Sequence, residues 1–177
     1  MKKFIIKTQT RKLLADTITP VSIYLRIRDI YPNSLLLESS DYHGNENSYS
    51  FICLKPLAGF EADNGITVET YPDGSVIKTP LNDHHSFNKR FKAFLQSFEH
   101  AENKASVPIN GLFGYTCYDA VKYFENIKLQ TKVIHDYKIP DVRYNFYNYI
   151  IAINHFQNNL HIIENRINDE PGELGRI

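Results

Sequence analysis

Cysteine is scarce in this 177-residue sequence, and net charge is absent. Its two cysteines, Cys53 and Cys117, are far apart with no Cys-x-x-Cys spacing, which fits a reducing compartment in which thiols stay free. A structural disulfide is therefore not expected. Twenty basic residues offset twenty acidic ones, giving a formal charge of zero. Because no field of one sign attracts a polyanion, nucleic acid is not an expected partner.

Long hydrophobic runs are also missing. Near the start, only Phe4, Ile5 and Ile6 are consecutively apolar before the next charge, too few for the apolar region of a signal peptide. No stretch approaches the roughly 20 apolar residues that span a bilayer. We expect a cytoplasmic protein without membrane contact, and 42% hydrophobic residues suffice for the core of one ordinary domain.

Common catalytic and metal-binding motifs are missing as well. The seven histidines form no His-Glu-x-x-His or His-x-His pattern. Asp83-His84-His85 is a tight cluster, but its place before a predicted helix fits surface polar residues better than a metal site. Gly111 to Gly114 lacks the lysine and the hydroxyl residue of a phosphate loop. Both cysteines lie in apolar, strand-like contexts that favour buried small hydrophobes over nucleophiles. We assign no catalytic residue and no metal ligand to this chain.

Apolar periodicity predicts a small number of helices. Thr19 as a cap and Pro20 at the first helical position begin one that runs to Ile30. Ser86 can cap a second helix. Its phenylalanine stripe is expected in the core, and consists of Phe87, Phe91, Phe94, Leu95 and Phe98. A short third helix is expected over 118–124.

Strands are predicted to outnumber helices. Apolar runs of strand length occur at 35–39, 49–54 and 111–115, and Pro56 is expected to end the second of them. Turn residues join further runs into hairpins at 66–71 with 75–79, where Ile66 and Val68 suggest one solvated face, and at 142–154 with 160–163. The predicted fold class is α+β, with mainly antiparallel sheet and flanking helices.

The segment Leu35-Leu36-Leu37-Glu38-Ser39 places a carboxylate and a hydroxyl directly after a buried strand. One interpretation is a strand end that meets water. The other is a small polar site, because a carboxylate and a hydroxyl can together bind an ammonium group. The pattern alone does not decide between them.

Several ordered motifs resemble anthranilate synthase component I. Leu-Leu-Leu-Glu-Ser-Ser-Asp at 35–41 is similar to the Leu-Leu-Glu-Ser signature of that family, and Tyr49-Ser50-Phe51-Ile52 is similar to its Tyr-Ser-Phe-Ile strand. Gly111 to Tyr115 and Tyr118 to Glu125 resemble its Gly-Leu-Phe-Gly-Tyr and Tyr-Asp-Ala-Val-Lys-Tyr-Phe-Glu segments. Ile139-Pro140-Asp141 follows in the order of the family. Together these markers extend over most of the chain.

The resemblance implies a site for tryptophan, the feedback inhibitor of the family. The Glu-Ser of the signature carries over to Glu38 and Ser39, and Leu37 would line the same pocket. Tyr49 lies on the neighbouring strand, where the family varies: many members carry an arginine just before this position, and this chain has Ser48.

For the whole enzyme, the resemblance implies amination of chorismate by ammonia and elimination of pyruvate to leave anthranilate. The ammonia would come from glutamine through a glutamine amidotransferase partner subunit, component II. Mg²⁺ would act in the full-length enzyme, with none bound by this fragment. Residues 1–177 would form the N-terminal regulatory domain, cut before the chorismate-binding catalytic domain. This fragment alone is then expected to be inactive.

Two alternatives stay open. Component I of aminodeoxychorismate synthase aminates a different ring carbon and holds tryptophan in a comparable N-terminal pocket. A stand-alone amino-acid-binding module would have no enzymatic half at all. Sequence beyond Ile177 would separate the module from either enzyme.

Overall fold

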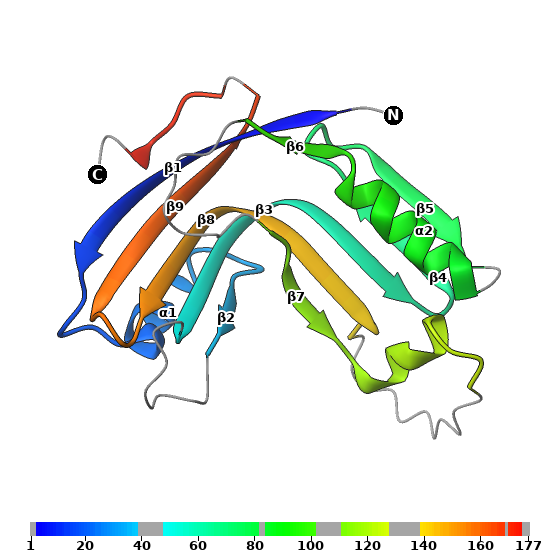
Figure 1. The fold of residues 1–177 in the computed structure, drawn as a ribbon, viewed down its shortest axis with the longest axis horizontal. Coiled ribbons are helices and arrows are strands. Elements are labelled where there is room, and N and C mark those ends of the chain that lie inside the picture. Colours follow the sequence, from blue (N-terminus) through cyan, green and yellow to red (C-terminus); the bar gives the residue numbers. More distant parts are fainter. Residues whose placement is uncertain are drawn as a thin grey trace. The chain divides into compact units, whose positions relative to one another are not determined.

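The structure is a computed structural model that describes residues 3–38, 48–81, 84–101, 111–127, 139–168 and 170–174. Its strand pairings are mainly antiparallel and its helices are few, so the predicted α+β class is confirmed (Figure 1). The elements are β1 (Phe4–Leu14), α1 (Pro20–Ile27), β2 (Leu35–Leu37), β3 (Tyr49–Asp63), β4 (Ile66–Thr70), β5 (Val76–Pro80), α2 (His84–Leu95), β6 (Phe98–His100), β7 (Phe113–Thr116), the 3₁₀ helix η1 (Tyr118–Tyr123), β8 (Val142–Asn154) and β9 (Asn159–Ile167).

Helix α1 begins where the sequence predicts. The Thr19 hydroxyl accepts a hydrogen bond from the Ser22 N–H at 3.1 Å, while the Thr19 N–H donates to Ser22 Oγ at 3.3 Å. This reciprocal capping box satisfies donors that the first turn leaves without partners. The helix ends at Ile27 rather than at Ile30 as predicted, because the Ile30 and Tyr31 N–H groups both turn back to the Ile27 carbonyl.

The chain divides into two compact units, whose boundaries fall within strands β1, β3, β6 and β8. The α2 unit, named after its helix, comprises Met1–Phe4, Ala58–Glu99 and Leu112–Phe146. The α1 unit comprises Ile5–Leu57, His100–Gly111 and Tyr147–Ile177.

In the α2 unit, a phenylalanine cluster joins helix α2 to the sheet. Phe60 of β3 lies within 4.9–5.6 Å, between ring centroids, of Phe87, Phe91 and Phe94. Phe87 and Phe94 are buried, so the predicted core stripe is confirmed at these two positions, while Phe91 is half-buried. The prediction is wrong for Leu95, which is 45% exposed, and Phe98 lies in β6 beyond the end of the helix. The helix starts at His84, which places Ser86 inside the first turn and makes its prediction as a cap wrong.

Strands β4 and β5 form the predicted hairpin beside this cluster, with Ile66 opposite Pro80. One face of β4 is the more exposed, as expected, but it carries Ile66, which is exposed, and Val68, which is half-buried. On the other face, Thr67 and Glu69 are fully buried. The buried carboxylate of Glu69 accepts hydrogen bonds from Tyr71 and Arg90, which offsets the cost of removing its charge from water.

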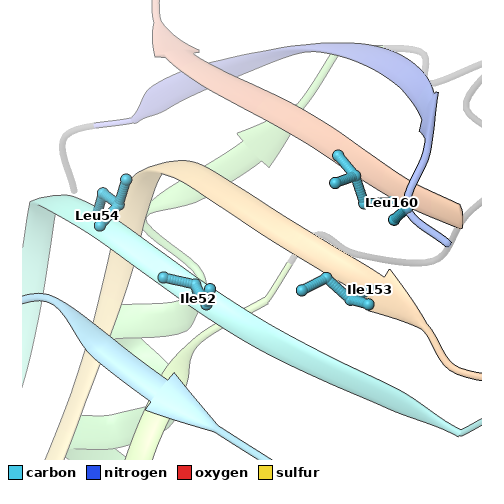
Figure 2. Packing of buried hydrophobic residues seen from close by; sticks show 5 residues of the cluster. Ile52, Leu54, Ile153 and Leu160 are labelled. Atoms are coloured by element: carbon cyan, nitrogen blue, oxygen red, sulfur yellow. The ribbon is translucent and has the colours of Figure 1, made fainter. Parts of the chain in front are cut away.

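The α1 unit contains a second core. Ile52 and Leu54 of β3, Ile153 of β8 and Leu160 of β9 pack together with Ala15, as Figure 2 shows for the four labelled side chains. Helix α1 contributes half-buried side chains to this core: Ile23, Tyr24 and Ile27. The hairpin of β8 and β9 is the one predicted, with Ile153 opposite Leu160.

Two strand predictions need correction. Strand β3 does not end at Pro56 but continues to Asp63, because Lys55 takes a left-handed backbone conformation (φ 53°) that lets the strand bend and resume. Strand β1 was not predicted, although it pairs with β9 from Ile6 to Leu14. Most of its side chains beyond Ile6 are exposed, so the strand carries little apolar alternation.

Candidate functional site

The predicted site residues lie in the α1 unit, where β2 and β3 pair. Leu37 is the last residue of β2, is half-buried, and has Phe51 of β3 as its Cα partner. Glu38 follows the strand directly and is exposed. Ser39 lies outside the described residues, so the structure places the carboxylate of the Glu-Ser pair but not its hydroxyl.

Tyr49 is the first residue of β3 and is half-buried. Its ring stacks on that of Phe51, with centroids 6.0 Å apart and an interplanar angle of 18°. Since Phe51 is also the strand partner of Leu37, one aromatic residue links the two predicted positions. Phe51 was not predicted as a site residue, although the two-residue period of a strand puts positions 49 and 51 on one face.

The residues that flank Tyr49 are anchored by the turn between β8 and β9. The His155 N–H donates to the Ser48 carbonyl oxygen at 3.0 Å. The His155 Nε2 and the Ser50 hydroxyl oxygen are 2.7 Å apart and hydrogen-bonded. Ser48 and Ser50 are both buried, so the backbone on each side of Tyr49 is fixed.

Burial raises the pKa of the Cys53 thiol to about 12, which keeps it neutral, as a buried small hydrophobe rather than a nucleophile. The half-buried Cys117 donates to the Pro140 carbonyl oxygen at 3.7 Å. Within the described ranges, no group of three or more His, Cys, Asp or Glu residues is placed to hold a metal ion. The Asp83-His84-His85 prediction falls outside the described side chains.

The later sequence markers have a packing role in the α2 unit. The Tyr123 hydroxyl donates to the Asp141 carboxylate at 2.6 Å, and the Lys122 ammonium lies 2.6 Å from the same oxygen. Burial, followed by the hydrogen bond to Asp141, raises the pKa of Tyr123, so the phenol stays a donor. Gly114 leaves no room for a side chain, since a Cβ there would lie 1.9 Å from the Arg143 carbonyl oxygen. These residues join η1 and β7 to the start of β8.

The α2 unit also has a groove of about 510 Å³ that none of the predicted site residues line. It is bounded by Phe87, Asn88, Phe91, Leu95, Leu112, Thr116, Phe124, Val142 and Tyr144. None of the helices among the described residues could span a membrane.

Comparison with known proteins supports the resemblance seen in the sequence. No protein-family model matches the chain. Anthranilate synthase component 1 of Lactococcus lactis subsp. lactis (strain IL1403) is 26% identical over 163 residues, 92% of this chain and 33% of that protein. The Mycolicibacterium smegmatis protein of the same name is 30% identical over 89% of this chain and 29% of its own length. That of Pseudomonas putida is 36% identical over 63% of this chain and 22% of its length.

Among solved structures, anthranilate synthase component I from Streptococcus pneumoniae TIGR4 matches with a TM-score of 0.49 and 18% identity, over 92% of this chain and 33% of that one. The chain spans about a third of the length of the curated relatives it matches. It is thus a relative of anthranilate synthase component 1 over most of its own length.

Proposed function

We propose that this relative of anthranilate synthase component 1 is the N-terminal regulatory domain of such an enzyme and carries part of a tryptophan feedback-inhibition site. The support is the similarity over 92% of the chain together with the motifs at 35–41, 49–52 and 111–125. The complete protein would aminate chorismate with ammonia and release pyruvate and anthranilate. A glutamine amidotransferase subunit would supply the ammonia.

Catalysis is assigned to residues outside this chain. Mg²⁺, the cofactor that the resemblance implies, would act in the rest of the complete protein. Among the described residues, no group of three or more His, Cys, Asp or Glu is placed to hold a metal ion. We therefore derive no catalytic step from this chain. The proposed contribution of this chain is to bind tryptophan, the end product.

The observation that carries the proposal is an apolar, aromatic surface next to a carboxylate. Leu37, Phe51 and Tyr49 are half-buried neighbours, and they offer a flat ring such as indole the aliphatic and aromatic contact that it needs. Glu38 adjoins Leu37 and supplies the negative charge that replaces water around the ligand's ammonium group. A hydroxyl from Ser39 would add a second acceptor.

The test is a tryptophan titration of anthranilate formation by the complete protein. Glu38→Ala should weaken inhibition by at least about 30-fold, because removing one partner of a desolvated charge pair leaves the other without compensation. Ser39→Phe should also weaken it, because a bulky ring replaces the hydroxyl acceptor. Lys89→Ala, on the exposed side of α2, is a suitable control and should keep the wild-type inhibition constant. If both site variants kept it too, Leu37 to Ser39 would be only a strand end.

The complete wild-type protein can also be used to test the proposed reaction. Formation of anthranilate from chorismate and ammonia, with Mg²⁺ present, is the expected outcome for the complete protein. Formation of aminodeoxychorismate instead would contradict the assignment and favour the alternative synthase.

A further inference from the structure

His155 makes contacts that distinguish it from the other residues of the turn between β8 and β9. Through its backbone it donates to the Ser48 carbonyl oxygen at 3.0 Å, and through its ring it bonds to the Ser50 hydroxyl at 2.7 Å. These two partners are the residues immediately before and after Tyr49. One histidine therefore holds both neighbours of a residue in the proposed inhibitor site.

Hydrogen bonds also fix the backbone of the turn that carries His155. The Asn154 side-chain oxygen accepts hydrogen bonds from the Phe156 and Gln157 N–H groups, at 2.9 and 2.8 Å, which closes the turn around position 155. Asn158 takes the left-handed conformation (φ 48°) that ends the turn. With the turn fixed in this way, His155 provides a rigid support rather than an adaptable one.

The hydrogen bond between the His155 ring and Ser50 replaces water at a buried hydroxyl. Ser50 has no exposed surface, so its hydroxyl needs a protein partner in place of water. On the preceding residue, the Tyr49 ring is limited from another direction by its stack on Phe51. The backbone of Tyr49 is thus held on both sides by His155 and its ring by Phe51.

We propose that His155 is a positioning residue for the inhibitor site, one that fixes where Tyr49 meets the ligand by bonding to both of its neighbours. This inference rests on the proposed function. His155 does not touch the ligand, and its effect passes through Ser48 and Ser50 to Tyr49.

The experiment measures tryptophan inhibition of the complete protein beside the KM for chorismate. His155→Ala and Ser50→Ala should each raise the inhibition constant about three- to tenfold, the effect of one lost hydrogen bond, without a matching rise in KM. The double variant should be no worse than either single one, since both remove the same bond. His155→Gln, which retains a side-chain nitrogen, should recover most of the wild-type inhibition. His100→Ala is the matched control, because that histidine is exposed at the end of β6.

Two outcomes would overturn the inference. If Glu38→Ala relieved inhibition while His155→Ala and Ser50→Ala both kept the wild-type inhibition constant, the tryptophan site would stand and the role of His155 would fall. If the inhibition constant and KM rose together in the His155 and Ser50 variants, His155 would support the fold as a whole and not the site. Should His155→Ala not fold, Ser50→Ala decides between these results, because it removes only the hydroxyl. Unchanged inhibition in Glu38→Ala would instead remove the proposed function itself.

Discussion

The Arg90 guanidinium lies 2.6 Å from the carboxylate of Glu69, whose side chain has no exposed surface. Arg90 belongs to α2 and Glu69 to β4, so this ion pair connects helix and sheet within the α2 unit. Tyr71 donates a hydrogen bond at 2.7 Å to the second carboxylate oxygen. Burial, followed by that hydrogen bond, raises the pKa of Tyr71 to about 12, so the phenol keeps the proton it donates.

Replacing Arg90 should destabilise the protein strongly. Arg90→Met leaves the buried Glu69 carboxylate without its cation, a loss of about 3–5 kcal/mol in the free energy of unfolding. Urea-induced unfolding measures it. The matched control is Arg143→Met, which breaks the half-exposed pair with Glu61 at 2.7 Å and should cost less than about 1 kcal/mol. Equal losses in the two variants would show that burial does not set the strength of these pairs.

Gly114→Ala should be disruptive where Gly111→Ala is not. A Cβ at position 114 would lie 1.9 Å from the Arg143 carbonyl oxygen, and backbone in a paired strand cannot move aside without breaking the pairing of β7 with β8. We expect a loss of about 2 kcal/mol or more in the free energy of unfolding. At Gly111 nothing lies within 4 Å of the added carbon, so thermal unfolding of that variant should match the wild type.

Local signals made part of this fold predictable. The Thr19-Pro20 start of α1 needs only residues within one turn, and the hairpin of β4 and β5 needs only the turn residues between its strands. The phenylalanine stripe of α2 follows from helical spacing alone. Leu37 and Tyr49 were assigned through resemblance, and the structure adds their link through Phe51.

Features that depend on distant partners could not be predicted. The exposed Ile66 and the buried Glu69 reverse the usual assignment of faces, because Arg90, 21 residues later, provides the compensating charge. Strand β1 forms because β9, more than 140 residues later, provides the partner for its backbone hydrogen bonds. His155 reaches Ser50 across 105 residues, and no local pattern marks that contact.

The buried thiol of Cys53 should make stability fall at high pH. Its pKa is raised by desolvation from 9.0 to about 12 in the folded protein, so above about pH 9 the unfolded chain loses this proton first and unfolding is favoured. The stabilising difference is fully present below pH 9 and is lost as pH rises through the folded pKa. Between pH 9.0 and 10.5, the loss is about 2 kcal/mol.

The measurement compares the wild type with Cys53→Ala by urea unfolding across this pH range, which cancels the titration of tyrosines and lysines. The wild type should lose stability faster than the variant. In parallel, a thiol reagent at pH 8 should label the half-buried Cys117 in the folded protein and the buried Cys53 only after unfolding. Parallel stability curves would contradict the burial of the thiol.

Two ligands that share one ring but differ in charge can test the carboxylate and the aromatic surface of the proposed inhibitor site separately. Tryptophan carries an ammonium group and indole-3-propionate does not, while both carry the same ring. In the complete protein, Glu38→Gln should weaken inhibition by tryptophan at least about 30-fold and leave any inhibition by indole-3-propionate unchanged, because only the ammonium meets the carboxylate. Tyr49→Ala should weaken both ligands by a similar factor, since it removes contact with the ring. Glu99→Gln, at an exposed glutamate that pairs with Lys3, is the matched control and should change neither inhibition constant. If Glu38→Gln weakened the two ligands equally, Glu38 would not be the partner of the ammonium. If Tyr49→Ala weakened neither, the aromatic surface of Tyr49 and Phe51 would lie outside the site.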